Sequence, residues 1–174
     1  MLNAIIFVVF PFCMVFAALS DLLSMTIANR VSVLLIATFA VAAPLTGMDW
    51  ATYGMHFATA GAVLLVTFTL FSIGGMGGGD AKLMTGIALW TGYSLILLQF
   101  LVYSALLGGL LTMLVLSLRA SPVAVVLSQM DFIRRIADKD TGIPYGIALG
   151  IAGLIIFPET PLARHVIDAA MLMP

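Results

Sequence analysis

Between two strongly apolar segments lies the sequence Gly74-Gly75-Met76-Gly77-Gly78-Gly79-Asp80-Ala81-Lys82. Because glycine has no Cβ, such a run lets another backbone approach closely. A carboxylate at membrane depth is costly unless it is paired, solvated or neutralised, so an acidic residue there is a candidate functional group. Asp80 is therefore the first candidate site residue. The alternative is a flexible connector whose aspartate caps the next helix.

Two nucleotide-binding motifs rich in glycine do not fit this stretch. Gly74 and Gly79 have the separation found in a phosphate-binding loop, but Asp80 stands where the lysine should follow. The dinucleotide fingerprint fails as well, because the run from Gly75 through Gly77 reaches Asp80 instead of a third glycine. No metal, nucleotide or flavin site is visible in the sequence, so we expect no cofactor.

The composition of the whole chain places this stretch in a membrane protein. Of 174 residues, 63% are hydrophobic and 9% are charged, whereas soluble domains average about 25% charged residues. We expect a single integral-membrane domain over residues 1–174. The net charge of −1 and the lack of a long basic run argue against nucleic-acid binding. Cys13 is the only cysteine, which excludes an internal disulfide and a paired-cysteine zinc site.

Apolar runs on both sides of the glycines predict an all-α bundle of about six transmembrane helices. The runs are Leu2–Leu19, Val31–Gly47, Met55–Ile73, Leu83–Trp90, Ser94–Leu118 and Ile143–Phe157. The fourth is short, so whether residues 81–92 cross the whole membrane stays open. We expect a loop over residues 48–53, an interfacial His56, and a terminal helix that starts at Thr160-Pro161. Apolar and charged residues at helical spacing within 119–142 predict a cytoplasmic amphipathic helix, with a solvated loop as the alternative.

Basic residues orient this bundle. The connections after the first, third and fifth runs carry Arg30, Lys82, Arg119, Arg134, Arg135 and Lys139, and the opposite face has only Arg164. The first face is therefore predicted to be cytoplasmic, with both termini outside. Asp21 and Asp80 then fall on the cytoplasmic side, and Asp49 falls on the other. Two acidic residues that converge from different helices are the minimum for a carboxylate pair.

These residues resemble a known family. Gly77–Asp80 matches the GxGD signature of intramembrane aspartyl proteases, and the following Ala-Lys-Leu matches its type IV prepilin peptidase branch. Asp21 with Ile27 and Asn29 resembles the first aspartate motif of that branch, and Pro144-Tyr145-Gly146 resembles its last-helix pattern. The likeness covers nearly the whole chain and is greatest to the small CpaA/TadV-like members of Flp (Tad) pilus systems. Ala28 departs from the proline of many relatives.

The resemblance implies an aspartyl endopeptidase that removes the leader peptide of prepilins and pseudopilins at the cytoplasmic face of the bacterial inner membrane. It implies Asp21 and Asp80 as the catalytic pair, without assigning the shared proton. Gly77, Gly78 and Gly79 would let a substrate strand approach, and Lys82 and Asn29 are candidate supporting residues. We expect Lys82 to reach the lipid headgroups, with tuning of Asp80 as the alternative.

Larger relatives add a cytoplasmic domain with paired cysteines and an N-methylating activity. The chain has no such cysteine pair, so we expect cleavage without methylation. Two other functions remain open on the sequence. One is an ion- or proton-coupled transporter subunit, although no inverted repeat is visible. The other is a noncatalytic assembly component whose small residues pack helices. The substrate, the oligomeric state and the distance between the two aspartates are left open.

Overall fold

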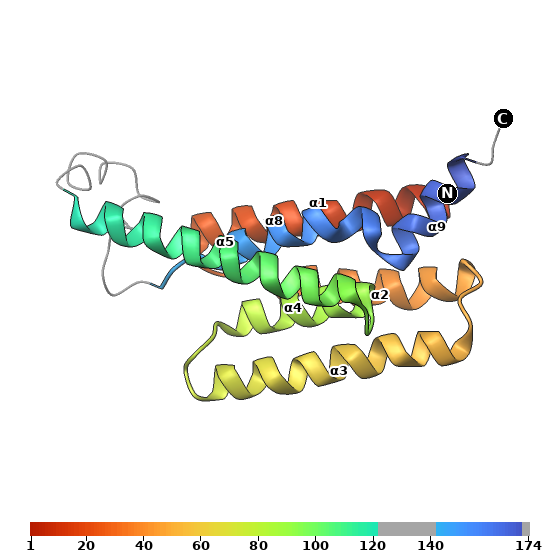
Figure 1. Cartoon of the computed structure of the whole chain (residues 1–174), viewed down its shortest axis with the longest axis horizontal. Helices are drawn as coiled ribbons and strands as arrows, with labels where there is room; N and C mark the ends of the chain where they lie inside the picture. Colours follow the sequence, from red (N-terminus) through yellow and green to blue (C-terminus); the bar gives the residue numbers. More distant parts are fainter. Residues whose placement is uncertain (122–141, 172–174) are drawn as a thin grey trace.

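A computed structural model describes residues 1–121 and 142–171, and this part of the chain folds into helices joined by short connections (Figure 1). The helices are α1 (Leu2–Ser24), α2 (Asn29–Leu45), α3 (Trp50–Ser72), α4 (Gly78–Thr91), α5 (Leu95–Ala120), α8 (Gly146–Ile156) and α9 (Pro161–Met171), with a 3-10 turn η1 (Phe157–Glu159). The predicted all-α class is confirmed. The amphipathic segment expected within 119–142 falls almost entirely outside the described residues.

Fewer helices than expected are long enough to cross a membrane unaided. Within the described ranges, α1, α3 and α5 have the necessary length and apolar character, and α8 with η1 and α9 makes a fourth span if that bent pair is counted as one. Because a straight span needs about 20 residues, α2 with 17 and α4 with 14 fall short. The chain fits a multi-pass membrane protein, but the expectation of about six spans is not confirmed.

The successive helices α1, α2, α3, α4, α5 and α8 run in alternating directions along the bundle, and α9 continues beyond α8 after a bend of 43° (Figure 1). α4 packs between α2 and α3, α8 packs between α1 and α5, and α1 joins the two groups by packing on α2. The alternation brings the end of α1 and the start of α4 to one end of the bundle, which therefore carries Asp21 and Asp80. Asp49, between α2 and α3, lies at the other end (Figure 1).

Two helix boundaries differ from the apolar runs, and local hydrogen bonds explain both. α1 continues beyond its apolar run to Ser24 and ends at Met25, which has a left-handed backbone and donates its N–H to the Asp21 carbonyl. Asp21 therefore lies in the last turn of the helix. α3 starts at Trp50 because the carboxylate of Asp49 accepts hydrogen bonds from the N–H groups of Ala51 and Thr52. The loop predicted over residues 48–53 is therefore too long.

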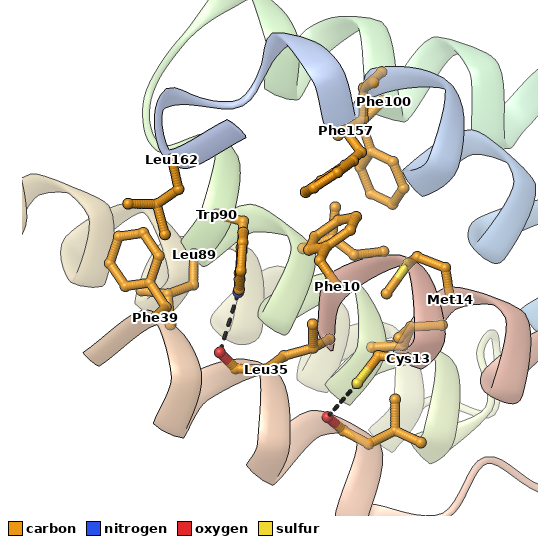
Figure 2. Packing of buried hydrophobic residues seen from close by; sticks show 14 of the residues in the cluster. Phe10, Cys13, Met14, Leu35, Phe39, Leu89, Trp90, Phe100, Phe157 and Leu162 are labelled. Atoms are coloured by element: carbon orange, nitrogen blue, oxygen red, sulfur yellow. Dashed lines mark hydrogen bonds between the residues drawn. The ribbon is translucent and has the colours of Figure 1, made fainter. Parts of the chain in front are cut away.

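An aromatic core joins the helices (Figure 2). The Phe10 ring lies 4.9 Å from that of Trp90 and 5.0 Å from that of Phe157. The fully buried indole of Trp90 donates to the Leu35 carbonyl at 3.1 Å. Cys13 is buried in the same cluster, as expected of a small apolar residue. At 1.5 Å per residue, this core lies roughly 15 Å along α1 and α4 from Asp21 and Asp80.

The far end of α4 is held by His56 of α3. The Nδ1 atom of His56 lies 2.7 Å from the Leu89 carbonyl, in the last turn of α4. The imidazole is buried within the protein, and its place at the membrane interface stays a prediction. Gly92 ends the helix with a positive φ of 62°, and a Cβ there would lie 2.7 Å from the His56 ring. The predicted break after α4 is confirmed, and it depends on glycine at this position.

Three glycines form the face of α8 that packs on α1. Gly146, Gly150 and Gly153 recur at helical spacing, so they share one side of the helix. A Cβ at Gly150 would lie 2.7 Å from the Met14 carbonyl oxygen, and one at Gly153 would lie 2.5 Å from the Met14 sulfur. The backbones of the two helices therefore approach more closely than any larger residue permits, which brings the start of α8 against Asp21.

Candidate functional site

A cavity of about 680 Å³ opens at the end of the bundle where α1 ends and α4 begins. Its walls come from the end of α1, the loop over residues 74–77, the start of α4, the middle of α5 and residues 142–145. Asp21 and Asp80 both line it. The structure thus brings the two sequence-predicted acidic residues into one enclosure, although they come from different helices.

Asp21 is held at this cavity by the start of α8. Its side chain is 6% exposed, and its Oδ2 atom accepts a hydrogen bond of 2.7 Å from the N–H of Gly146. The first N–H groups of a helix have no partner within the helix, so they are free to donate to a carboxylate. A Cβ at Gly146 would lie 2.9 Å from both Cβ and Oδ2 of Asp21. Glycine is therefore required where α8 meets Asp21.

Asp80 is the third residue of α4 and lies beside the backbone of Gly77, which caps that helix. Its carboxylate accepts a hydrogen bond from the Gly77 backbone, and a Cβ at Gly77 would lie 2.8 Å from Oδ2 of Asp80. A third-position carboxylate that reaches back to the cap residue is a standard way to start a helix. Asp80 also lines the cavity that contains Asp21. Capping the helix and lining the cavity are therefore compatible roles for this residue.

The glycine stretch divides into two parts with different surroundings. Gly74, Gly75 and Gly77 line the cavity. Gly78 and Gly79 lie in the first turn of α4, where added Cβ atoms would be 3.2 Å from the Phe71 ring and 3.0 Å from the Ile27 side chain. Of the three glycines expected to face a substrate, the structure therefore brings only Gly77 to the cavity. The other two let α4 pack closely on its neighbours.

Lys82 and Asn29, the candidate supporting residues, contact each other and do not line the cavity. The Nζ atom of Lys82 donates to Oδ1 of Asn29 at 2.8 Å. Both side chains are exposed at the cavity end of the bundle. The contact joins the start of α4 to the start of α2.

Several lining residues had not been singled out from the sequence as site residues. Met25, Met76 and Met84 give the cavity flexible apolar walls, and Ser104 lines it from α5. The methionines carried no signal, because this residue type is spread throughout the chain. Tyr145 was marked only by the Pro-Tyr-Gly pattern. Its hydroxyl donates to the Ser104 carbonyl at 3.0 Å, which fixes its ring at the cavity wall.

Two carboxylates in one partly enclosed site can divide acid and base chemistry between them. Close carboxylates do not both ionise readily, so they share a proton and titrate as a pair. The ionised member can accept a proton from water, and the protonated member can donate one to a carbonyl oxygen. Within the described ranges, no three His, Cys, Asp or Glu side chains gather in a group that could hold a metal ion.

A sequence model of the type IV leader peptidase family matches residues 8–113. The chain belongs to the type IV leader peptidase family. The resemblance inferred from the motifs is thereby confirmed at the level of the family, which is one of peptidases. The matched region contains Asp21 and Asp80, whereas Tyr145 and Gly146 lie beyond it. Searches of the curated proteins and of the solved structures find no match to this chain.

Proposed function

We propose that this leader peptidase family member is an aspartyl endopeptidase in which Asp21 and Asp80 form the catalytic pair. The observation that supports this most directly is that both carboxylates line one cavity at the same end of the bundle. Two carboxylates that line the same partly enclosed cavity are placed to share a proton and titrate as a pair. The family supplies the reaction class, and the cavity supplies a pair of acids suited to it.

Hydrolysis by such a pair proceeds by proton transfers in which each carboxylate acts once as acid and once as base. The ionised carboxylate takes a proton from a water molecule, whose oxygen attacks the scissile carbonyl carbon. The protonated carboxylate donates its proton to the carbonyl oxygen, which yields a neutral tetrahedral intermediate. When the C–N bond breaks, the carboxylate that took up the proton gives it to the leaving amine. A hydroxyl of the intermediate returns a proton to the other carboxylate as the carbonyl re-forms, which restores the starting pair. Either aspartate can start as the base.

The substrate we propose is the leader peptide of a prepilin-like protein of the Flp type, cleaved at the cytoplasmic face of the inner membrane. Arg30, Lys82 and Arg119 all belong to the cavity end of the bundle, and the Arg164–Glu159 ion pair belongs to the other end. An excess of basic residues favours the cytoplasmic side, which supports this orientation. A basic leader would remain in the cytoplasm, where the cavity opens.

Gly74, Gly75 and Gly77 are proposed to receive the backbone around the scissile bond. They line the cavity beside Asp80 and present no side chain there, so an extended peptide could approach the carboxylate closely. Met25, Met76 and Met84, which also line the cavity, would adapt to apolar side chains of the substrate. Gly78 and Gly79 would support this arrangement indirectly, by setting how closely α4 packs on its neighbours.

Replacing each aspartate by asparagine tests the pair. An asparagine at position 21 would still offer an oxygen to the Gly146 N–H, so Asp21→Asn should fold. Either single change should lower the rate of prepilin cleavage at least about 10³-fold, and the double change should add little, because the two acids act as a unit. Asp49→Asn is the matched control at the far end of the bundle and should cleave at the unmodified rate.

Cleavage would be followed by mass spectrometry with purified protein in detergent, and melting of each variant would be measured in the same buffer. Substantial cleavage by a folded Asp21→Asn or Asp80→Asn variant would rule out the aspartyl mechanism. Activity that falls only as far as the amount of folded protein would point to a structural role for these residues instead.

A further inference from the structure

We propose that Tyr145 and Gly146 are positioning residues, through which α5 holds the Asp21 carboxylate in place. Tyr145 is anchored on Ser104 and Gly108 of α5, and the adjacent Gly146 donates its N–H to Asp21. This inference rests on the proposed catalytic role of Asp21. It assigns neither residue a contact with the reacting atoms.

The Tyr145 ring is anchored on one face of α5. Ser104 and Gly108 are four residues apart on α5, so they lie on the same face, and both are buried. The Tyr145 hydroxyl donates to the Ser104 carbonyl at 3.0 Å. A Cβ at Gly108 would overlap the Tyr145 ring and lie 2.5 Å from its hydroxyl oxygen. The ring therefore occupies a recess that exists only because residue 108 is glycine.

The turn at the start of α8 connects this recess to the Asp21 carboxylate. Tyr145 immediately precedes α8, and its own backbone N–H bonds to the Ile143 carbonyl at 2.7 Å, which makes a tight turn. Fixing the ring therefore fixes the first residue of the helix. That residue is Gly146, whose N–H lies 2.7 Å from Oδ2 of Asp21. A displacement of the ring along α5 would lengthen or misalign this hydrogen bond.

The hydrogen bond from Gly146 determines how the Asp21 carboxylate is placed for catalysis. Asp21 lies in the last turn of α1, next to the connection that leads into α2, so its own helix constrains it from one side only. The hydrogen bond from Gly146 fixes one carboxylate oxygen and with it the plane of the group. A misplacement of about 1 Å in a catalytic constellation can cost 10²-fold in rate. Loosening the anchor should therefore reduce turnover while leaving in place the glycine loop and the methionines proposed to bind the substrate.

The experiment compares Gly108→Ala with Gly109→Ala in the full-length chain. These are the same chemical change at adjacent positions of α5, but a Cβ at Gly109 would meet nothing within 4 Å. Gly108→Ala should lower kcat for prepilin cleavage about 10- to 100-fold with KM nearly unchanged. Gly109→Ala should behave as the unmodified enzyme. Tyr145→Phe keeps the ring and loses the bond to Ser104, so it should lower kcat less than Gly108→Ala does.

Rates would be expressed per folded molecule, with melting and monodispersity measured for each variant. Gly108→Ala and Tyr145→Phe kinetics equal to those of Gly109→Ala would overturn the inference. A rise in KM at constant kcat would also overturn it, because Tyr145 would then be a substrate contact. Asp21→Asn and Asp80→Asn are measured in parallel. If these two stay active, the proposed function itself fails, whereas inactive aspartate variants beside a fully active Gly108→Ala refute only the positioning role.

Discussion

Gly150→Ala offers the sharpest test of the close packing that brings α8 to Asp21. The added methyl group would lie 2.7 Å from the carbonyl oxygen of Met14, which is backbone and has no rotamer by which to move away. Gly61→Ala in α3 is the matched control, because a Cβ there would meet nothing within 4 Å. Both glycines lie inside helices, so the intrinsic effect on helix formation is the same.

The structure sets the size of the expected difference. Ordinary non-bonded contacts are about 3.5 Å or longer, so α8 and α1 must separate locally by roughly 0.8 Å in Gly150→Ala. Overpacking of this kind costs about 1–3 kcal/mol. Replacing glycine by alanine stabilises the helix itself by up to about 1 kcal/mol. We therefore expect Gly150→Ala to be about 1–3 kcal/mol less stable in free energy of unfolding than Gly61→Ala, because the gain in helix propensity is common to both variants.

Unfolding would be measured in mixed micelles by titration with denaturing detergent, followed by circular dichroism. Cleavage should also fall in Gly150→Ala, because separation of the helices moves the Gly146 N–H away from Asp21. A Gly150→Ala protein at least as stable as Gly61→Ala would refute the close approach of α8 to α1. Asp21 would then not be held by the close packing of α8 on α1.

Two further predictions concern the ends of the bundle. Hydrogen bonds from the side chain and backbone of Thr52 hold the pKa of the Asp49 carboxylate below its ordinary value. The ionised carboxylate therefore stabilises the fold at neutral pH. This stabilisation is lost as the pH falls through the pKa that Asp49 has in the folded protein. Asp49→Ala should therefore melt at a lower temperature at pH 7 with unchanged kcat, and the difference in Tm should shrink below about pH 4. In a Cys13→Ser background, cysteines at Ser24 and at Thr52 should react with impermeant reagents from opposite sides of the membrane, the first from the cytoplasm. Labelling of both from one side would contradict the alternation of the helices.

The sequence predicts that the two aspartates lie at the same end of the bundle, because this depends only on the alternating direction of successive helices. Once successive apolar runs are taken to alternate in direction, the ends of the first and third runs must share a face, and Asp21 and Asp80 stand at those ends. The clustering of basic residues on the same connections gave an independent indication of that face. Neither the alternation of the helices nor the clustering of basic residues depends on how the helices pack.

The contacts that could not be predicted from the sequence depend on how the helices pack. The bond between Gly146 and Asp21 joins residues 125 positions apart, and no local pattern specifies such a contact. Glycines that look alike in sequence also differ in surroundings, since Gly77 lines the cavity whereas Gly79 packs on Ile27. The length of α1 was underestimated because its last turn carries Asp21, a polar residue that faces a cavity instead of lipid. The apolar run ends before the helix does.

The separation of the two carboxylates follows from how α1 and α4 are joined elsewhere. Phe10 and Trp90 bring these helices together at the core, with ring centroids 4.9 Å apart, roughly 15 Å along each helix from the aspartates. Close-packed cores deform little, so this contact fixes the angle at which the helices leave it. At the cavity end, glycines, flexible methionines and the hydrogen bonds of Tyr145 and Gly146 complete the arrangement. The rigid end therefore sets the approximate distance between the acids, and the contacts of Tyr145 and Gly146 determine the final orientation of Asp21.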